Sequence, residues 1–315
     1  MTRSRSARLS RRLSAKFRGG KDLPSLRTIL LTGSLPALTA AKAVGRSLGA
    51  LSGDQLRVML YHDVSPTQHA QFEAQLRWLS QSWRFVSPQE FVAMLSGAMP
   101  ARGRNLLLTF DDGFASNRSV AEQVLAPMGV RALFFVVSDF VTLESRQEAR
   151  AYVARHIQPG KRPEDIPAHL YNMDWPDLEA LLEQGHSIGG HTRSHARLSE
   201  LGENDLQAEI VHSADTLSQR LGAPIEHFAY PFGDVASVSS RAFAIARTRF
   251  RYVYSGLRGG NARQPPPVAL CRDAVSPADS IPVAGALLEG AADLMYVRSR
   301  VELASWARQG GDGRD

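Results

Sequence analysis

Short apolar runs alternate with amphipathic segments along most of this chain. The runs predict strands at 56–61, 106–110, 132–137, 186–190, 226–230, 252–255 and 268–271. Apolar residues recur at helical spacing between them, at 72–79, 88–95, 119–125, 175–183 and 206–221. Because such alternation is typical of a mostly parallel sheet, the pattern predicts an α/β fold, a distorted (β/α) barrel of about seven strands.

The alternation also divides the chain into three parts. We expect a basic leader at 1–52, a barrel domain at 53–305 and a disordered tail at 306–315. Residues 142–172 are polar and do not fit the alternation, so we expect an insertion over one rim of the barrel. This insertion either shapes a substrate groove or is a plain surface segment.

Positive charge is concentrated in the leader. Residues 1–27 contain nine of the 37 basic residues and one of the 31 acidic residues, and the rest of the chain is close to neutral. The net charge of +6 therefore belongs to the leader. Its basic residues predict peripheral contact with anionic lipid, and a solvated tail is the alternative interpretation. We expect no nucleic-acid partner.

The leader has features of a targeting segment as well. Residues 28–41 are uncharged and mildly apolar, as in a signal peptide, and 41–43 (Ala-Lys-Ala) resembles a cleavage site. Apolar residues between 35 and 51 also recur at helical spacing, which equally favours an amphipathic helix on the domain or on a membrane. We expect a cytoplasmic or inner-membrane-peripheral protein rather than an exported one.

The chain contains a single cysteine, Cys271, in an apolar run. One cysteine excludes an internal disulfide and a multi-cysteine metal site. The apolar neighbours predict a buried strand residue, and because burial raises a thiol pKa, we do not expect catalysis by this thiol.

Two short segments contain the candidate chemistry. Asp111 and Asp112 directly follow one predicted strand, and His191 and His195 follow another. The carboxyl ends of barrel strands share one rim, so we expect the two segments to meet there. On one helical turn the two imidazoles would face the same way. Two His and one Asp leave open positions on a zinc-like ion, which predicts a metal-dependent hydrolase with the second Asp as a base.

These segments resemble a known family. The runs 109–113 (Thr-Phe-Asp-Asp-Gly) and 191–195 (His-Thr-Arg-Ser-His) are similar to the first two signature motifs of the polysaccharide deacetylase family, which has the NodB-homology fold. The run 228–234 is similar to the third motif, around a Pro-aromatic pair. The three motifs occur in the family's order, and the resemblance covers about 56–277.

The resemblance implies a role for each motif residue. Asp112, His191 and His195 would bind one divalent ion, with zinc expected. Asp111 would be the general base that activates water. A backbone N–H near Phe232 would stabilise the oxyanion of the tetrahedral intermediate. Substrate and oxyanion contacts are expected from Tyr230, Pro231 and Phe232.

The chain departs from the family pattern in two places. The family commonly supplies a general acid from a late Leu-X-His motif, but no His follows His227. We predict His62 as the acid, in a branch similar to the poly-N-acetylglucosamine deacetylases. Where relatives commonly have an Arg that orients the base, this chain has Ala229, and we predict that Arg272 replaces it. A structural His62 and a surface ion pair of Arg272 are the alternatives.

The predicted function is hydrolysis of N-acetyl groups on a bacterial glycan or glycolipid sugar. An O-acetyl esterase or another amide hydrolase of the same fold is one alternative, since relatives use this metal set for each. A non-catalytic sugar-binding relative is the other. The presence of Asp111 beside the metal ligands favours an enzyme, because a pure binder needs no base.

Overall fold

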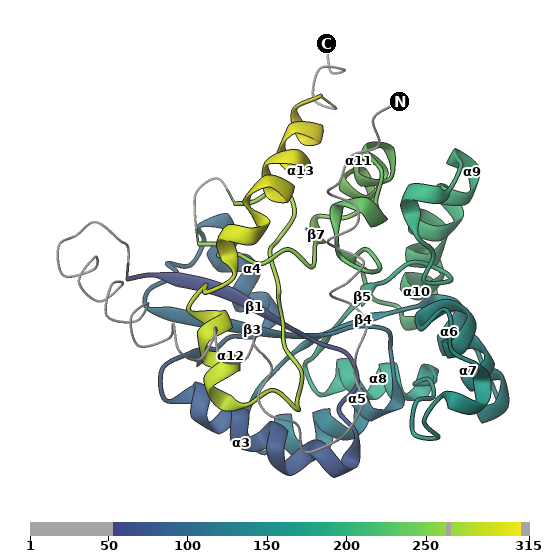
Figure 1. Cartoon of the computed structure of the whole chain (residues 1–315), viewed down its shortest axis with the longest axis horizontal. Helices are drawn as coiled ribbons and strands as arrows, with labels where there is room; N and C mark the ends of the chain where they lie inside the picture. Colours follow the sequence, from purple (N-terminus) through teal and green to yellow (C-terminus); the bar gives the residue numbers. More distant parts are fainter. Residues whose placement is uncertain (1–52, 263–265, 310–315) are drawn as a thin grey trace.

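A single sheet of parallel strands forms the centre of the protein, whose computed structural model describes residues 53–262 and 266–309 (Figure 1). Seven strands follow one path in the order β7-β6-β5-β4-β3-β1-β8, and β2 pairs with β3 beside this path. The strands are β1 (Gln55–Tyr61), β2 (Arg84–Phe85), β3 (Arg104–Phe110), β4 (Leu133–Val136), β5 (Ser187–Gly190), β6 (His227–Ala229), β7 (Tyr252–Tyr254) and β8 (Asp273–Ala274).

The sheet curls until its two edges approach each other. Tyr254 of β7 makes an isolated parallel bridge with Leu270, which lies three residues before β8. The Leu270 N–H donates to the Val253 carbonyl at 2.8 Å, and the Ser255 N–H donates to the Leu270 carbonyl at 2.9 Å. The predicted barrel of about seven strands is confirmed as a curled half-barrel of parallel strands.

Helices cover the outside of the sheet, because parallel strands need crossover connections. Figure 1 shows α3, α5, α8 and α10 around the central strands. The helical elements are η1 (Pro66–Gln68), α3 (His69–Ser80), α4 (Pro88–Ser96), α5 (Ala115–Val120), η2 (Ala121–Leu125), α6 (Ser138–Val141), α7 (Arg146–Tyr152), η3 (Val153–Ile157), η4 (Pro163–Asp165), α8 (Trp175–Glu183), η5 (Leu198–Glu200), α9 (Glu203–Leu206), η6 (Gln207–His212), α10 (Ser213–Leu221), η7 (Val235–Ser237), α11 (Ser240–Arg249), α12 (Ile281–Leu288), η8 (Asp293–Tyr296) and α13 (Val297–Gln309).

The two sides of β3 face different apolar clusters. Leu106 and Leu108 pack with residues of the outer helices, whereas Leu107 packs with Tyr254 and with Phe91 of α4 on the concave side of the sheet. Successive side chains of a strand point to opposite faces, so Asp111, four residues beyond Leu107, continues the concave row. The fold therefore places this carboxylate at the carboxyl end of the barrel interior.

The predicted strand at 268–271 is wrong. Residues 268–271 form no strand, and β8 lies two residues further along, at Asp273–Ala274. The side chain of Asn261 forms hydrogen bonds with both main-chain groups of Cys271. Asn261 Oδ1 accepts from the Cys271 N–H at 2.9 Å, and Asn261 Nδ2 donates to the Cys271 carbonyl at 3.0 Å. Because these groups are occupied, Cys271 cannot pair with a neighbouring strand, although it is buried as predicted.

Two predicted helices also have different bounds. The helix predicted at 119–125 begins earlier, at Ala115. The helix predicted at 206–221 is a helical run of α9, η6 and α10, in which η6 is a wide turn of the π type. The tail predicted to be disordered at 306–315 begins later, because 306–309 belong to α13 and Trp306 packs against the core. The predictions for the leader at 1–52 and for 310–315 lie outside the described residues. No helix in the described part of the chain is long and apolar enough to span a bilayer.

His227 of β6 makes the stability of the barrel sensitive to acid. Its Nδ1 lies 3.0 Å from the Tyr254 hydroxyl, and burial lowers its pKa from 6.5 to about 4. The unfolded chain then binds a proton that the native state excludes, so stability is complete above about pH 6.5 and falls as the pH drops towards 4, by roughly 3 kcal/mol. We expect His227→Gln to reduce this loss between pH 7 and 4.5, measured by urea unfolding at each pH. The exposed His212 gives a control, His212→Gln, which should leave the pH dependence unchanged.

Candidate active site

The end of β3 delivers two buried carboxylates. Asp111 and Asp112 are 2% and 3% exposed. Asp112 has a left-handed backbone, with φ at 76°, and the turn continues through Gly113 with φ at 88°. A Cβ on Gly113 would lie 3.2 Å from the side chain of Val136, so the turn needs glycine for both its conformation and its space.

The end of β5 delivers the two histidines on a loop, not on the helical turn considered from the sequence. Thr192 and His195 are both left-handed, with φ at 67° and 62°. The His195 N–H donates to Thr192 Oγ1 at 3.0 Å, which closes the loop on itself. His191 and His195 are both buried. The loop, rather than a helix, turns the two imidazoles towards Asp112.

Three donor atoms converge as a metal site requires. Asp112 Oδ1 lies 3.5 Å from His191 Nε2 and 3.4 Å from His195 Nε2. Zinc bonds of about 2.0–2.2 Å in tetrahedral geometry put ligand atoms roughly 3.3 Å apart. Asp112 Oδ1 is buried and makes no hydrogen bond of ordinary geometry with the described residues. The trio is the metal-capable cluster of the described chain, and its spacing fits one divalent ion.

Both imidazoles are oriented through their other ring nitrogen. His191 Nδ1 lies 2.6 Å from the Ala229 carbonyl, and His195 Nδ1 lies 3.0 Å from the His156 carbonyl. A carbonyl oxygen only accepts, so each Nδ1 is the donor. This arrangement leaves the Nε2 atoms to bind an ion, as in many metal sites with histidine ligands.

The carboxylate of Asp112 and the imidazole of His195 shift each other's pKa values towards the charged forms. Burial alone would raise the pKa of the Asp112 carboxyl, but the imidazoles of His191 and His195 outweigh it and hold that pKa well below its usual range. Burial alone would lower the pKa of His195, but the Asp112 carboxylate raises it overall. The pocket thus favours positive charge beside Asp112.

Arg272 is a buried partner of Asp111, which excludes the surface ion pair. Arg272 is 1% exposed. Its Nη1 and Nη2 donate to the two oxygens of Asp111 at 2.7 and 2.9 Å, and its Nε donates to the Ser255 carbonyl at 2.9 Å. A bidentate contact of this kind fixes the plane of the carboxylate. The arginine reaches Asp111 from the position directly before β8, whereas Ala229 lies at the end of β6.

A cavity of about 370 Å³ joins these groups to the other predicted residues. Its lining includes His62, Phe232 and the carboxylates, together with both ligand histidines. His62 is exposed and its carbonyl accepts from Asn117 Nδ2 at 2.7 Å. Phe232 is 41% exposed, and its ring lies 4.9 Å from that of His195. Tyr230 and Pro231 are buried and are not part of this lining.

Backbone strain gathers around this cavity. Four non-glycine residues of the described chain have left-handed backbones, and all four belong to the ends of β3, β5 and β6: Asp112, Thr192, His195 and Phe232. Left-handed conformations in such residues each cost about 1–2 kcal/mol and persist only where the surroundings impose them. Clustering of this kind is typical of functional sites.

The segment 142–172 contributes more than the sequence indicates. It contains α7, η3 and η4, and its Ala149, Val153 and Ile166 pack in one apolar cluster with Phe114 and Phe140. At the end of η3, the His156 carbonyl orients His195, and Ile157 and Gln158 line the cavity. The polar composition of this segment gave no signal for these contacts.

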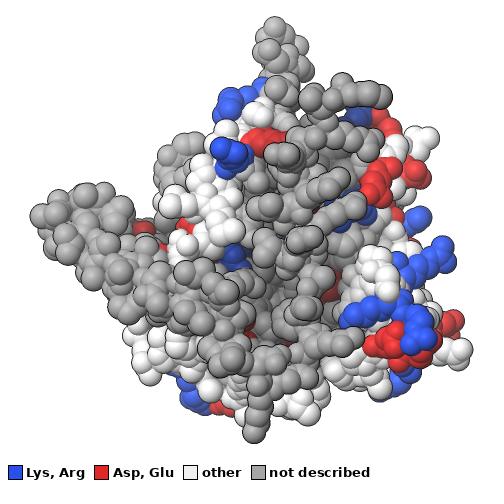
Figure 2. Space-filling model, in the orientation of Figure 1, with Lys and Arg blue, Asp and Glu red and all other residues white. Residues whose placement is uncertain are grey.

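The surface charges are mixed on the face shown in Figure 2. Lysine and arginine side chains lie next to aspartate and glutamate side chains along the right-hand edge of that view. The described residues visible there form no continuous basic area.

Comparisons with known proteins agree with the fold. The profile of the family described as polysaccharide deacetylase matches residues 98–250, which include both carboxylates, both histidines and the third motif. The Bacillus subtilis protein YxkH, named as a candidate polysaccharide deacetylase, is 23% identical over 241 residues, or 75% of this chain and 76% of that protein.

Solved structures share the architecture. IcaB from Ammonifex degensii superposes with a TM-score of 0.57 at 25% identity, covering 76% of this chain and 98% of that one. The Streptococcus pyogenes deacetylase PplD, solved with acetate, superposes with a TM-score of 0.55 at 20% identity, covering 74% and 97%. The half-barrel, the three motifs, the profile match over 98–250 and these relatives all show that the chain resembles the polysaccharide deacetylase family.

Proposed function

We propose that this protein is a metal-dependent deacetylase that hydrolyses N-acetyl groups on a bacterial glycan or glycolipid sugar. The observation that carries the proposal is the trio Asp112, His191 and His195 beside the Asp111–Arg272 pair, all facing one cavity. The catalytic domain is proposed to span 53–305. Contact with an anionic membrane through the basic leader stays a prediction.

The residues divide the hydrolysis between them. A zinc ion held by the trio would polarise the acetyl carbonyl and lower the pKa of a nearby water molecule. Asp111 accepts a proton as the water oxygen bonds to the carbonyl carbon, and Arg272 holds the carboxylate in place. The N–H of Phe232 stabilises the oxyanion, and His62 donates a proton to the sugar nitrogen as the carbon–nitrogen bond breaks. Acetate and a free amine are the products.

Acetate release tests the proposal directly. The protein, loaded with zinc, is incubated with N-acetylated chitooligosaccharides, an N-acetylated glycolipid sugar and O-acetylated xylan, and acetate is quantified by mass spectrometry. We expect release from an N-acetylated substrate, abolished by a chelator and restored by a divalent ion. Release that is unaffected by chelation would refute metal dependence. Glycan binding without acetate release under any metal would favour the non-catalytic sugar binder.

His62 separates amide hydrolysis from ester hydrolysis. An amine leaves poorly unless it is protonated, whereas an alcohol leaves more readily, so the general acid matters more for the amide. We expect His62→Ala to lower N-deacetylation by about a hundredfold and ester cleavage by less than about fivefold. His212→Ala is the control, because this exposed His of η6 does not line the cavity. Equal losses on both substrates would show that His62 is not the acid.

A further inference from the structure

The loop between the two ligand histidines is held in a conformation that it would not adopt alone. Two of its five residues, Thr192 and His195, have left-handed backbones. Each costs about 1–2 kcal/mol for a residue with a Cβ. The loop must therefore gain its shape from contacts with the rest of the protein.

Main-chain contacts with α6 hold one side of the loop. The Ser138 N–H donates to the Thr192 carbonyl at 3.2 Å, and the Asp139 N–H donates to the Arg193 carbonyl at 2.9 Å. These bonds satisfy loop carbonyls and leave the N–H groups of Arg193 and Ser194 to be satisfied elsewhere. A buried main-chain N–H group needs an acceptor, so both groups require one within hydrogen-bond distance.

Glu209 is that acceptor. Its Oε2 accepts from the Arg193 N–H at 3.0 Å and from the Ser194 N–H at 2.9 Å, and its Oε1 accepts from Ser194 Oγ at 2.7 Å. Glu209 is 4% exposed, so these bonds replace its hydration. It belongs to η6, the wide helical turn between α9 and α10, and such turns frequently occur at functional sites.

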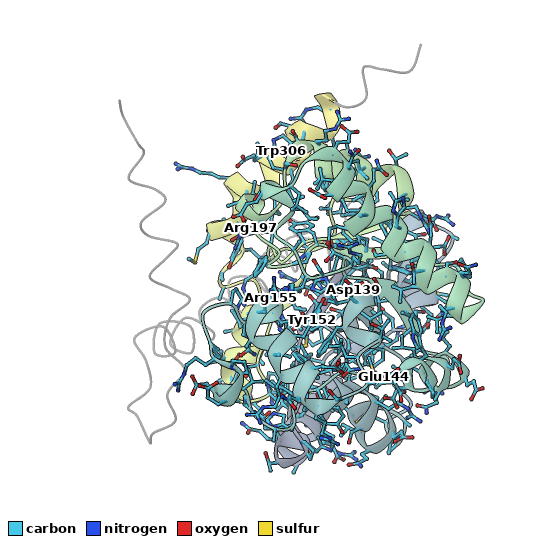
Figure 3. All side chains as sticks on the ribbon, turned by 90° about the vertical axis from the view of Figure 1, so that its right-hand side faces the viewer. Asp139, Glu144, Tyr152, Arg155, Arg197 and Trp306 are labelled. Atoms are coloured by element: carbon cyan, nitrogen blue, oxygen red, sulfur yellow. The ribbon has the colours of Figure 1, made fainter. Side chains whose placement is uncertain are left out.

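Arg193 brings a positive charge close to the Glu209 carboxylate. Arg193 Nε lies 3.7 Å from Glu209 Oε1 and 3.6 Å from Asp139 Oδ2. Figure 3 looks onto this side of the molecule, where Asp139 and Tyr152 lie next to each other. Burial raises the pKa of the Tyr152 hydroxyl, and the neighbouring carboxylates of Asp139 and Glu209 raise it further. The hydroxyl therefore stays protonated and lies 3.5 Å from the Arg193 carbonyl.

We propose that Glu209 is a positioning residue for the metal site: its carboxylate fixes the loop so that both ligand Nε2 atoms face Asp112. This inference rests on the proposed metal role of His191 and His195. Glu209 itself touches neither the ion nor the substrate. Supporting contacts of this kind typically affect metal affinity by 10–100-fold.

The chemistry of the side chain predicts which replacements succeed. Alanine leaves two buried N–H groups and one hydroxyl without their partner, and the loop relaxes. Glutamine keeps one oxygen for both N–H groups, and its amide can donate to Ser194 Oγ, which accepts as well as donates. Aspartate keeps the charge but is one methylene shorter, so it cannot reach all three donors.

Zinc affinity is the readout, measured by competition with a chromophoric chelator on the full chain. We expect Glu209→Ala to weaken zinc binding by 10–100-fold and Glu209→Gln to stay within about threefold of the wild type. The matched control is Asp215→Ala, which removes an exposed carboxylate of α10 that pairs with Arg249 at 2.8 Å. This control should leave zinc affinity unchanged, and kcat should follow zinc occupancy in every variant.

The outcomes separate this inference from the proposed function. If the wild type binds zinc and a folded Glu209→Ala chain binds it with the same affinity, only the positioning role is overturned. A wild-type chain that binds no divalent ion overturns the metal site and the positioning role together. If the alanine variant does not fold, Glu209→Asp decides: a loss of at least about fivefold supports the role, and wild-type affinity overturns it.

Discussion

We expect zinc binding to be lost and acetate release to fall by about a thousandfold or more when Asp112 is replaced by Asn. The substitution keeps the size and shape of the side chain but removes the negative charge, and a neutral amide oxygen is a poor ligand for zinc. Asp112 Oδ1 lies between the two imidazoles at 3.4 and 3.5 Å, so no other described carboxylate completes the same trio. Zinc content after dialysis and acetate release measure the two effects.

The adjacent carboxylate gives a matched control. Asp111→Asn is expected to keep zinc and to lower kcat by a hundredfold to ten-thousandfold, because it removes the base but not a ligand. The two variants thus differ by one position and should differ in metal content. Stoichiometric zinc in Asp112→Asn would show that another residue is the third ligand.

Replacement of Arg272 by Met costs both stability and activity. The Asp111 carboxylate then stays buried without the guanidinium that contacts both of its oxygens. Breaking a buried ion pair from one side costs about 3–5 kcal/mol. A base without a fixed orientation also reacts more slowly, and we expect kcat to fall on the order of a hundredfold. Urea unfolding and steady-state kinetics measure the two effects.

The double variant Asp111→Asn with Arg272→Met tests the cause. Removing both charges eliminates the unpaired carboxylate, so the double variant should regain most of the stability that Arg272→Met loses. Arg272→Lys should be intermediate, because a single ammonium group cannot contact both oxygens in one plane. A double variant that is less stable than either single variant would indicate that Arg272 acts mainly through the Ser255 carbonyl.

The sequence predicted the parts of the fold that depend on local pattern. Apolar runs gave the strands from β1 to β7 apart from the short β2, because a strand buried on both faces has few polar residues. The trio was predicted from spacing and resemblance, and the structure brings its three donor atoms within 4.8 Å of one another. The strand at 268–271 failed because one distant side chain, Asn261, captures the main chain of Cys271. No local pattern encodes such a contact.

The position of Glu209 in the sequence indicates that its side chain is buried. It is three residues from Leu206 and four from Ser213, on the stripe of the amphipathic helix that is otherwise buried. A charged residue on an apolar helix face indicates a buried partner. Which partner it has depends on how the β5 loop folds, and that loop is shaped by α6 and by the end of η3 as well as by its own Thr192.

The short stretch from His156 to Gln158 has two roles in the site. Its first carbonyl steadies a ligand imidazole, and its next two side chains form a wall of the cavity. An insertion or deletion in this stretch would change the wall and would also shift the carbonyl that orients the His195 imidazole. Substitutions of the Ile157 and Gln158 side chains would change this wall of the cavity without moving the carbonyl that orients the imidazole.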